Sequence, residues 1–335
     1  MRKHYLDFIR IISILSVIVI HATSMYIADF PSTGWDILCI QNSMSRFSVP
    51  AFCMISGALF LNPDKEITIK NIYLKYIPRI IVSLVLWDCF YSLVEFYYGG
   101  FDINVFIETF LDGQIHFWFC YMIIGFYMIV PILRLITKDM KVTKYLLLIM
   151  FVFSYVMPTL SQLNILPLVT LTATRLQISL FSATTFYFIL GYYLDQNDLN
   201  KYIISIYLLG IFGAFMTYYL TKQATIASGS LSTAYLNNTT IYVLFETAAV
   251  FILSKNVFKN VQNKYLLKFL SISKYVYGIF LMHMFVLNFM TNLGLFQPGS
   301  NYLITVPFIS VLTFVICLIG TLIISKIPVL KDWIM

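Results

Sequence analysis

Residues 7–26 read DFIRIISILSVIVIHATSMY, a stretch that is apolar enough to cross a lipid bilayer and yet contains Asp7, Arg10 and His21. A spanning helix needs about 20 mostly apolar residues. An ionised side chain at the centre of such a helix costs about 2.5 to 3.5 kcal/mol on insertion scales, so it usually faces protein or a water-filled cavity. The stretch therefore predicts a transmembrane helix with one polar stripe turned toward the inside of a helix bundle.

The composition of the whole chain supports this prediction. Of its 335 residues, 60% are hydrophobic and only 11% are charged, which is more apolar surface than a soluble core can absorb. The net charge of +7 does not indicate a nucleic-acid partner, because the basic residues form short clusters between apolar runs instead of one solvated face. We expect a multi-pass membrane protein whose main partner is the bilayer.

Ten apolar runs are candidate membrane spans, and the connections between them are too short for a soluble domain. We therefore expect an all-α, polytopic membrane protein in which residues 1–335 form a single membrane-embedded domain. A short amphipathic helix at the membrane interface is expected within residues 99–116. The candidate spans are residues 7–28, 37–62, 80–98, 117–137, 145–160, 178–194, 202–221, 237–254, 272–292 and 301–325.

The basic residues indicate the orientation of the chain. Most of the 22 Lys and Arg residues fall in the N-terminal tail and in alternate connections. Short loops rich in Lys and Arg stay on the cytoplasmic side of a membrane. Because the number of predicted spans is even, both termini are predicted to be cytoplasmic.

The polar residues of the first span lie on one stripe. At 100° and 1.5 Å per residue, a separation of eleven residues is about three turns and about 16 Å. Arg10 and His21 therefore share a face, with Arg10 near the cytoplasmic surface, His21 deeper, and Asp7 one turn before Arg10. The alternatives are an arginine that reaches the interface by snorkelling and a histidine bonded to a neighbouring helix.

The second span, which contains SRFSVPAFCMISGALFL (residues 45–61), has a second arginine within the membrane. Pro50 is expected to bend the helix beside Arg46. Arg46 either binds a phosphate or carboxylate or forms a structural ion pair with Asp88 or Glu246, and the sequence does not decide between the two. Ser56 and Gly57 are small enough for close contact with another helix.

Three further motifs carry candidate functional residues. The segment KEITIKNIYLKYIPRI (residues 65–80) places Lys75 and Arg79 at the cytoplasmic surface, where they either follow the positive-inside bias or bind a phosphorylated donor. His116 and Trp118 open the fourth span at the interface, a usual position for tryptophan. His283 lies deep in the ninth span. The four histidines have none of the usual metal-binding spacings, so no metal site is expected.

In the first span, D-x-x-R followed by ten residues and His resembles the opening of the acyltransferase-3 family of integral membrane acyltransferases. The resemblance covers nearly the whole chain. It includes SRFSVPAFCMISGALFL, HFWFCYMIIGFYMIVPILR (residues 116–134), YFILGYYL (residues 187–194) and YGIFLMHM (residues 277–284). Arg10 and His21 match the essential arginine and histidine of the family. Lys75 and Arg79 resemble its arginine-rich cytoplasmic motif, with a lysine at the first position.

The resemblance implies transfer of an acyl group, usually acetyl, from cytoplasmic acetyl-coenzyme A to a hydroxyl of a sugar or cell-envelope glycan. Acetyl-coenzyme A would be a substrate, and no bound cofactor is expected. The sequence shows no appended extracytoplasmic hydrolase-like domain, so we expect the acceptor to be handled by the membrane domain or by a partner. A lipid-linked sugar is one candidate acceptor, and glycan-assembly proteins are candidate partners.

The working hypothesis is therefore O-acyl transfer with His21 as the base that activates the acceptor hydroxyl. Arg10 would position the donor and Asp7 would orient Arg10, with Lys75 and Arg79 binding the donor. His116 and Trp118 would line the acceptor side, and Arg46 and His283 would have supporting or substrate-binding roles. A ping-pong mechanism, in which the acyl group is first transferred to a protein residue, is left open. The rival hypotheses are a transporter or flippase for a lipid-linked sugar or small anion and a non-catalytic partner in glycan synthesis.

Overall fold

The computed structural model describes residues 2–176, 182–328 and 333. Within these residues all regular elements are helices, so the predicted all-α class is confirmed. Eight helical stretches of the described chain are long and apolar enough to cross a membrane, and the protein is a multi-pass integral membrane protein. These stretches are His4–Ser24, Ile69–Tyr98, Ile103–Thr137, Met140–Gln162, Asn200–Ser228, Ala234–Phe258, Lys264–Asn292 and Tyr302–Ile324.

Several of these stretches contain short 3₁₀ or π turns, which are labelled η. In chain order the elements are α1 (His4–Ser24), α2 (Trp35–Ser43), α3 (Ser48–Phe60), α4 (Ile69–Asn71), η1 (Ile72–Tyr76), α5 (Ile77–Tyr98), α6 (Ile103–Asp112), η2 (Ile115–Phe117), α7 (Trp118–Thr137), α8 (Met140–Phe151), η3 (Val152–Val156), α9 (Met157–Gln162), α10 (Pro167–Arg175), α11 (Ala183–Gln196), η4 (Asn200–Tyr202), α12 (Ile203–Ser228), η5 (Ala234–Leu236), α13 (Ile241–Phe258), α14 (Lys264–Leu270), η6 (Ser271–Tyr275), α15 (Val276–Asn292) and α16 (Tyr302–Ile324).

The remaining two predicted spans have shorter helices. The span expected at residues 178–194 corresponds to α11, and its first residues, 178–181, lie outside the described residues. The span expected at 37–62 is divided into α2 and α3 by a series of turns, so Pro50 is associated with a break and not with the bend that we predicted. Proline lacks the N–H that would bond to the carbonyl of residue 46, and it is tolerated in the first turn of a helix. The break places Arg46 in irregular backbone between the two helices.

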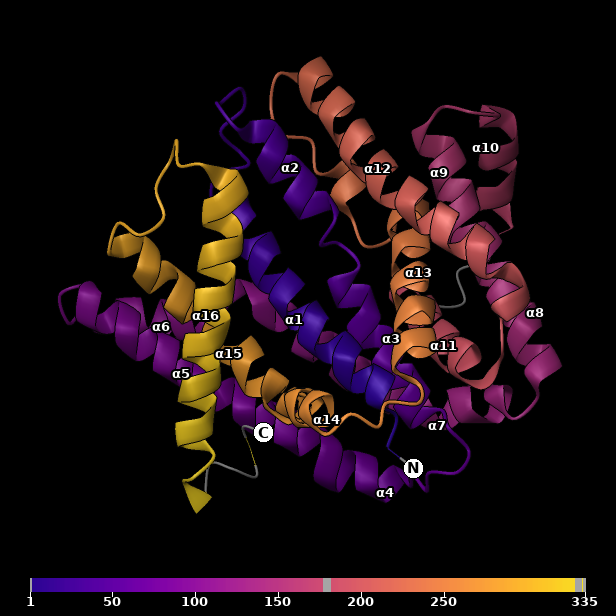
Figure 1. Cartoon of the computed structure of the whole chain (residues 1–335), viewed down its shortest axis with the longest axis horizontal. Helices are drawn as coiled ribbons and strands as arrows, with labels where there is room; N and C mark the ends of the chain where they lie inside the picture. Colours follow the sequence, from indigo (N-terminus) through magenta and orange to yellow (C-terminus); the bar gives the residue numbers. More distant parts are fainter. Residues whose placement is uncertain (1, 177–181, 329–332, 334–335) are drawn as a thin grey trace.

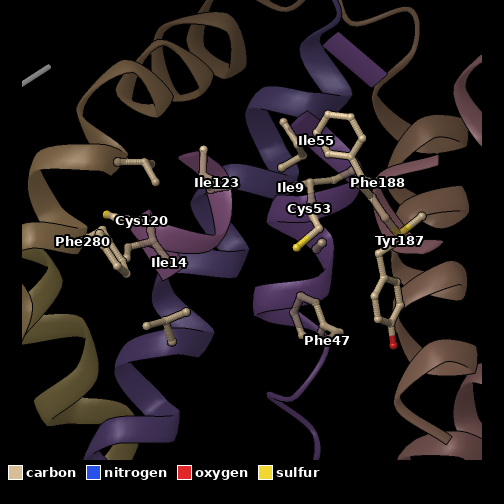
Figure 2. Packing of buried hydrophobic residues seen from close by; sticks show 14 of the residues in the cluster. Ile9, Ile14, Phe47, Cys53, Ile55, Cys120, Ile123, Tyr187, Phe188 and Phe280 are labelled. Carbon is tan, nitrogen blue, oxygen red and sulfur yellow. The ribbon is translucent and has the colours of Figure 1, made fainter. Parts of the chain in front are cut away.

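Helix α1 occupies the centre of the bundle. It crosses the middle of Figure 1 and packs against α2, α3, α13, α15 and α16. Its residues Ile9 and Ile14 are fully buried, and Figure 2 shows them among core side chains of α3, α7, α11 and α15. A helix surrounded in this way can turn its polar stripe toward protein, as the sequence predicted.

Helices α3 and α11 approach each other at two glycines. A Cβ atom added to Gly57 would lie 1.6 Å from the carbonyl oxygen of Phe188, and one added to Gly191 would lie 2.1 Å from that of Met54. No side chain fits at such distances, so small residues set the separation of these helices. The close contact predicted at Gly57 is confirmed.

The start of α5 contains a π turn next to a proline. Pro78 lies at the beginning of α5, directly after η1, and its missing N–H disfavours a regular helical hydrogen bond at this point. Turns of this kind are frequent at functional sites. Here the turn ends at Tyr76 and precedes Arg79, and both residues line the main cavity described below.

One edge of the bundle carries the elements that we predicted to be cytoplasmic. The start of α1, helix α4 and helix α14 lie toward the same edge of Figure 1, which we call the predicted cytoplasmic side. The amphipathic helix expected within residues 99–116 is present as α6, which has no buried residues and packs on α5. The sidedness in the membrane stays a prediction.

Candidate active site

The carboxylate of Asp7 organises the predicted cytoplasmic end of α1. Asp7 is only 3% exposed, and its oxygens accept hydrogen bonds from Arg2 Nε at 2.7 Å and from Arg10 Nη1 at 3.1 Å. The hydroxyl of Ser273 donates a third bond at 2.7 Å. Asp7 therefore holds Arg10 in place, in the way the sequence predicted, and also joins α1 to η6.

A cavity opens beside Arg10. It has a volume of about 390 Å³ and is lined by the basic residues Arg10, Arg79 and Lys274. The rest of the wall is largely apolar and includes the aromatic residues Phe52, Phe60, Tyr76, Phe119, Tyr127 and Phe280. We call it the main cavity. It combines cationic groups near α1 and η6 with an aromatic interior.

A second cavity adjoins the main cavity on the predicted cytoplasmic side. It has a volume of about 370 Å³, and Arg10, Leu59, Ser273 and Lys274 line both cavities. Its basic residues are Arg2, Lys3, Arg10, Lys65 and Lys274, and Asp7 is its single acidic residue. We call it the basic mouth. Such an excess of positive charge favours an anionic ligand.

Lys65 lies in the loop that precedes α4, at the edge of the basic mouth. Partial desolvation lowers the pKa of its amine below the usual value, and the positive charges of neighbouring residues, Arg10 first among them, lower it further. The backbone of this loop is held by Arg134, which donates to the carbonyl oxygens of Phe60, Asn62 and Lys65 at 2.8 to 2.9 Å. The loop is thus fixed although it is irregular.

Three histidines from distant parts of the sequence meet in the interior. The ring centres of His21 and His283 are 5.2 Å apart, those of His116 and His283 are 5.0 Å apart, and those of His21 and His116 are 6.5 Å apart. They come from α1, η2 and α15. His116 and His283 are buried, and both nitrogens of His116 lack a hydrogen-bond partner within the described part of the chain. We call this group the histidine cluster.

Phe280 belongs to both the main cavity and the histidine cluster. Its side chain lines the cavity, while its ring centre lies 5.4 Å from that of His116 and 5.8 Å from that of His283. Its backbone oxygen lies 2.5 Å from His283 Nδ1. The wall at Phe280 therefore separates a ligand in the cavity from the histidines by the thickness of one aromatic ring.

Comparison with known families agrees with this arrangement. A family model described as an acyltransferase domain, Acyl_transf_3, matches residues 3–325. The chain belongs to the acyltransferase-3 family. No curated protein and no solved structure matches it. The family match spans all the elements that form the two cavities and the histidine cluster of this acyltransferase.

Arg46 of the acyltransferase does not pair with either of the acids considered from sequence. Its guanidinium donates to Oδ1 of Asn42, at 2.8 Å from Nε, and Asn42 in turn donates to Thr23 Oγ1 at 2.7 Å. Among the described residues no ion pair joins Arg46 to Asp88 or Glu246. Arg46 interacts electrostatically with both His21 and Glu246. Its hydrogen bonds thus leave its charge without a paired carboxylate.

Two other predicted site residues lie apart from the cavities. Lys75 is exposed and does not line either cavity, whereas Arg79, one turn later, lines the main cavity. Trp118 is 47% exposed and its described ring contact is with Phe119. The structure therefore brings His116 into the cluster without Trp118, which has the exposure of an interfacial aromatic residue.

Sequence reasoning missed several residues that form the site of this acyltransferase. Ser273 and Lys274 precede α15. Polar and basic residues are usual in the cytoplasmic connection before a predicted span, so the sequence did not distinguish these two as site residues. Tyr127 lies in a continuous apolar run, where no local signal marks it. Among the described residues no group of three His, Cys, Asp or Glu side chains has an arrangement that could hold a metal ion.

Proposed function

We propose that this acyltransferase is a membrane O-acyltransferase that moves an acyl group, acetyl in the first instance, from cytoplasmic acyl-coenzyme A to a hydroxyl of a cell-envelope or exopolysaccharide sugar. The observation that carries the proposal is that the basic mouth adjoins the main cavity, whose wall residue Phe280 contacts His116 and His283 of the histidine cluster. The donor is bound as a substrate and leaves as free coenzyme A.

The two cavities suit the two ends of an acyl-coenzyme A molecule. Its phosphates are anionic and match the cations of the basic mouth. Its uncharged pantetheine arm and its acyl group match the aromatic main cavity. Arg10 lies where the two cavities join, and Asp7 fixes its guanidinium. The distance from Arg10 to His21 along α1 is about 16 Å, which leaves room for an extended donor.

His21 is the proposed general base. A sugar hydroxyl is a poor nucleophile until a base within hydrogen-bond reach removes its proton. As the new C–O bond forms at the acyl carbonyl, His21 takes the hydroxyl proton. When the C–S bond breaks, His21 returns the proton to the departing thiolate. The charge of Arg46, which forms no ion pair among the described residues and interacts electrostatically with His21, stabilises the negative charge that develops on the carbonyl oxygen.

The acceptor is a glycan or lipid-linked sugar that reaches the histidine cluster from the side opposite the basic mouth. This placement follows from the donor path, because the main cavity is filled by the donor. A sugar carried on a membrane lipid would already be confined to the bilayer, and proteins of glycan assembly would supply it.

The test uses purified protein in lipid nanodiscs, acetyl-coenzyme A, and envelope glycan from cells that lack the protein. We expect release of free thiol together with an acetylated glycan detected by mass spectrometry. His21→Gln should lower this rate by at least about 100-fold without changing the amount of protein in the membrane. Movement of unmodified lipid-linked sugar with no thiol release would instead support a flippase, and normal activity of His21→Gln would overturn the assignment of the base.

A further inference from the structure

The hydrogen bonding of His283 determines which of its nitrogens carries a proton. Nδ1 lies 2.5 Å from the backbone oxygen of Phe280. A carbonyl oxygen only accepts, so Nδ1 is the donor, and in the neutral ring Nε2 then has the lone pair. Nε2 is fully buried and has no hydrogen-bond partner among the described residues. A buried acceptor without a donor is costly, so this atom is arranged to receive an N–H or O–H.

Tyr91 of α5 shapes the turn of α15 that contains His283. Its hydroxyl donates to the backbone oxygen of Leu281 at 3.0 Å and accepts from the backbone N–H of Phe285 at 3.1 Å. In a regular α-helix these two backbone groups bond to each other. The hydroxyl thus bonds to both partners of this backbone pair, a position from which a side chain can locally open a helix. The Tyr91 ring also packs edge-on against His116, with ring centres 5.9 Å apart.

Two histidine rings lie near enough to His283 to supply the missing donor: that of His116, at 5.0 Å between ring centres, and that of His21, the proposed base. The ring centre of His21 is 5.2 Å from that of His283. A nitrogen-to-nitrogen hydrogen bond of about 2.9 Å, with about 1.1 Å from each nitrogen to its ring centre, spans the same distance. The separation of the two rings therefore matches such a bond with α1 and α15 where they are.

We propose that His283 is a positioning residue for His21, that its Nε2 accepts the N–H of His21, and that Tyr91 sets this geometry by holding the turn 281–285 open. The inference rests on the proposed function. With one nitrogen of His21 donating to His283, the other nitrogen has its lone pair directed at the acceptor hydroxyl. His21 gains the hydroxyl proton and passes it to the leaving thiolate. His283 neither gains nor loses a proton, and its lone pair stabilises the positive charge that His21 carries between the two steps.

Two substitutions of His283 separate this role from a merely structural one. In His283→Gln the side-chain amide reaches the position of Nε2 and offers an acceptor to His21. In His283→Asn the amide replaces Nδ1, so the bond to Phe280 remains and the acceptor for His21 is lost. We expect kcat to fall about 100-fold in His283→Asn and less than about 10-fold in His283→Gln, with KM for acetyl-coenzyme A within about twofold in both. A role confined to the Phe280 bond predicts the reverse order.

Tyr91→Phe is the second variant. It keeps the ring against His116 and removes the inserted hydroxyl, after which Leu281 and Phe285 can bond to each other. We expect an unchanged thermal unfolding midpoint and a fall in kcat of about 10-fold, because a small displacement of His283 misplaces His21. Tyr121→Phe is the control, since Tyr121 is 61% exposed on α7, and it should have wild-type kcat.

The outcomes distinguish this inference from the proposed function. If wild-type protein releases no thiol and acetylates no glycan, the proposed function is wrong and the inference fails with it. If the wild type is active and His283→Asn has full kcat or exceeds His283→Gln, only the inference is wrong. If His283→Asn does not fold, Tyr91→Phe decides, and wild-type kcat in that variant overturns the inference.

Discussion

Ser273 Oγ donates a 2.7 Å hydrogen bond to Asp7 Oδ1, although the two residues lie near opposite ends of the sequence. The bond joins α1 to η6. It lies where the basic mouth meets the main cavity, because Ser273 and Arg10 line both cavities. The Asp7 carboxylate of α1, which binds Arg10, is thus also bound by Ser273 of η6. The proposed donor site depends on this junction.

Asp7→Asn keeps the shape of the side chain and removes its charge. Arg2 and Arg10 then lose their shared carboxylate, and their ion pairs become weaker hydrogen bonds to a neutral amide oxygen. We expect KM for acetyl-coenzyme A to rise about 5- to 10-fold, which corresponds to roughly 1 kcal/mol of donor binding. Initial rates over a range of donor concentrations measure the effect. An unchanged KM would show that Asp7 does not set the position of Arg10 for the donor.

Substitutions of Arg79 and Lys75 are predicted to change the KM for acetyl-coenzyme A to different extents, although both residues belong to the same sequence motif. Arg79 lines the main cavity and Lys75 lines neither cavity. Arg79→Ala should raise KM for acetyl-coenzyme A about 10-fold by removing a cation that contacts the donor. Lys75→Ala, the matched control, should raise it less than about twofold, since Lys75 lies outside both cavities and its charge is screened by salt. Equal effects in the two variants would mean that both residues act through general surface charge.

Lys65 is predicted to make donor binding sensitive to alkaline pH. Its pKa is lowered from the usual value by partial desolvation and by neighbouring cations, so it loses its charge at a lower pH than an ordinary lysine. A bound phosphate favours the charged form. KM for acetyl-coenzyme A should therefore rise, about threefold, as the pH increases through the lowered pKa of Lys65. Lys65→Arg keeps the charge throughout this range, and its KM should stay flat where that of the wild type rises.

Local periodicity was sufficient to predict one side of the site. Asp7, Arg10 and His21 lie on a single uninterrupted helix, so their shared face follows from helix geometry alone. The contact of Asp7 with Ser273 does not follow from helix geometry, because it depends on how η6 packs against α1. The same limit applies to His116 and His283, which sequence analysis could select only as isolated polar residues in apolar segments. Their meeting with His21 is a property of the packed bundle.

The break between α2 and α3 shows a second limit. Pro50 correctly marked a disturbance beside Arg46, but a proline inside an apolar run is compatible with a kink or with the first turn of a new helix. In the structure Pro50 lies in the first turn of a new helix, α3. Between residues 42 and 48 the backbone hydrogen bonds of the turns join the N–H of residue i to the carbonyl oxygen of residue i−3. Which form is adopted depends on tertiary contacts, here including the hydrogen bond from Asn42 to Thr23 of α1.

Gly57→Ala tests whether the α3–α11 contact is needed for the bundle. The added methyl would overlap the Phe188 carbonyl, which is backbone and cannot move without separating the two helices. We expect a loss of stability of about 1–3 kcal/mol or more, seen as a lower unfolding midpoint in detergent. Gly125→Ala on α7 is the matched control, because a Cβ there meets no atom within 4 Å, and replacing a mid-helix glycine by alanine should leave stability equal or slightly higher. Equal midpoints for the two variants would show that α3 and α11 can separate at little cost, and the main cavity, whose wall includes α3, would then be deformable.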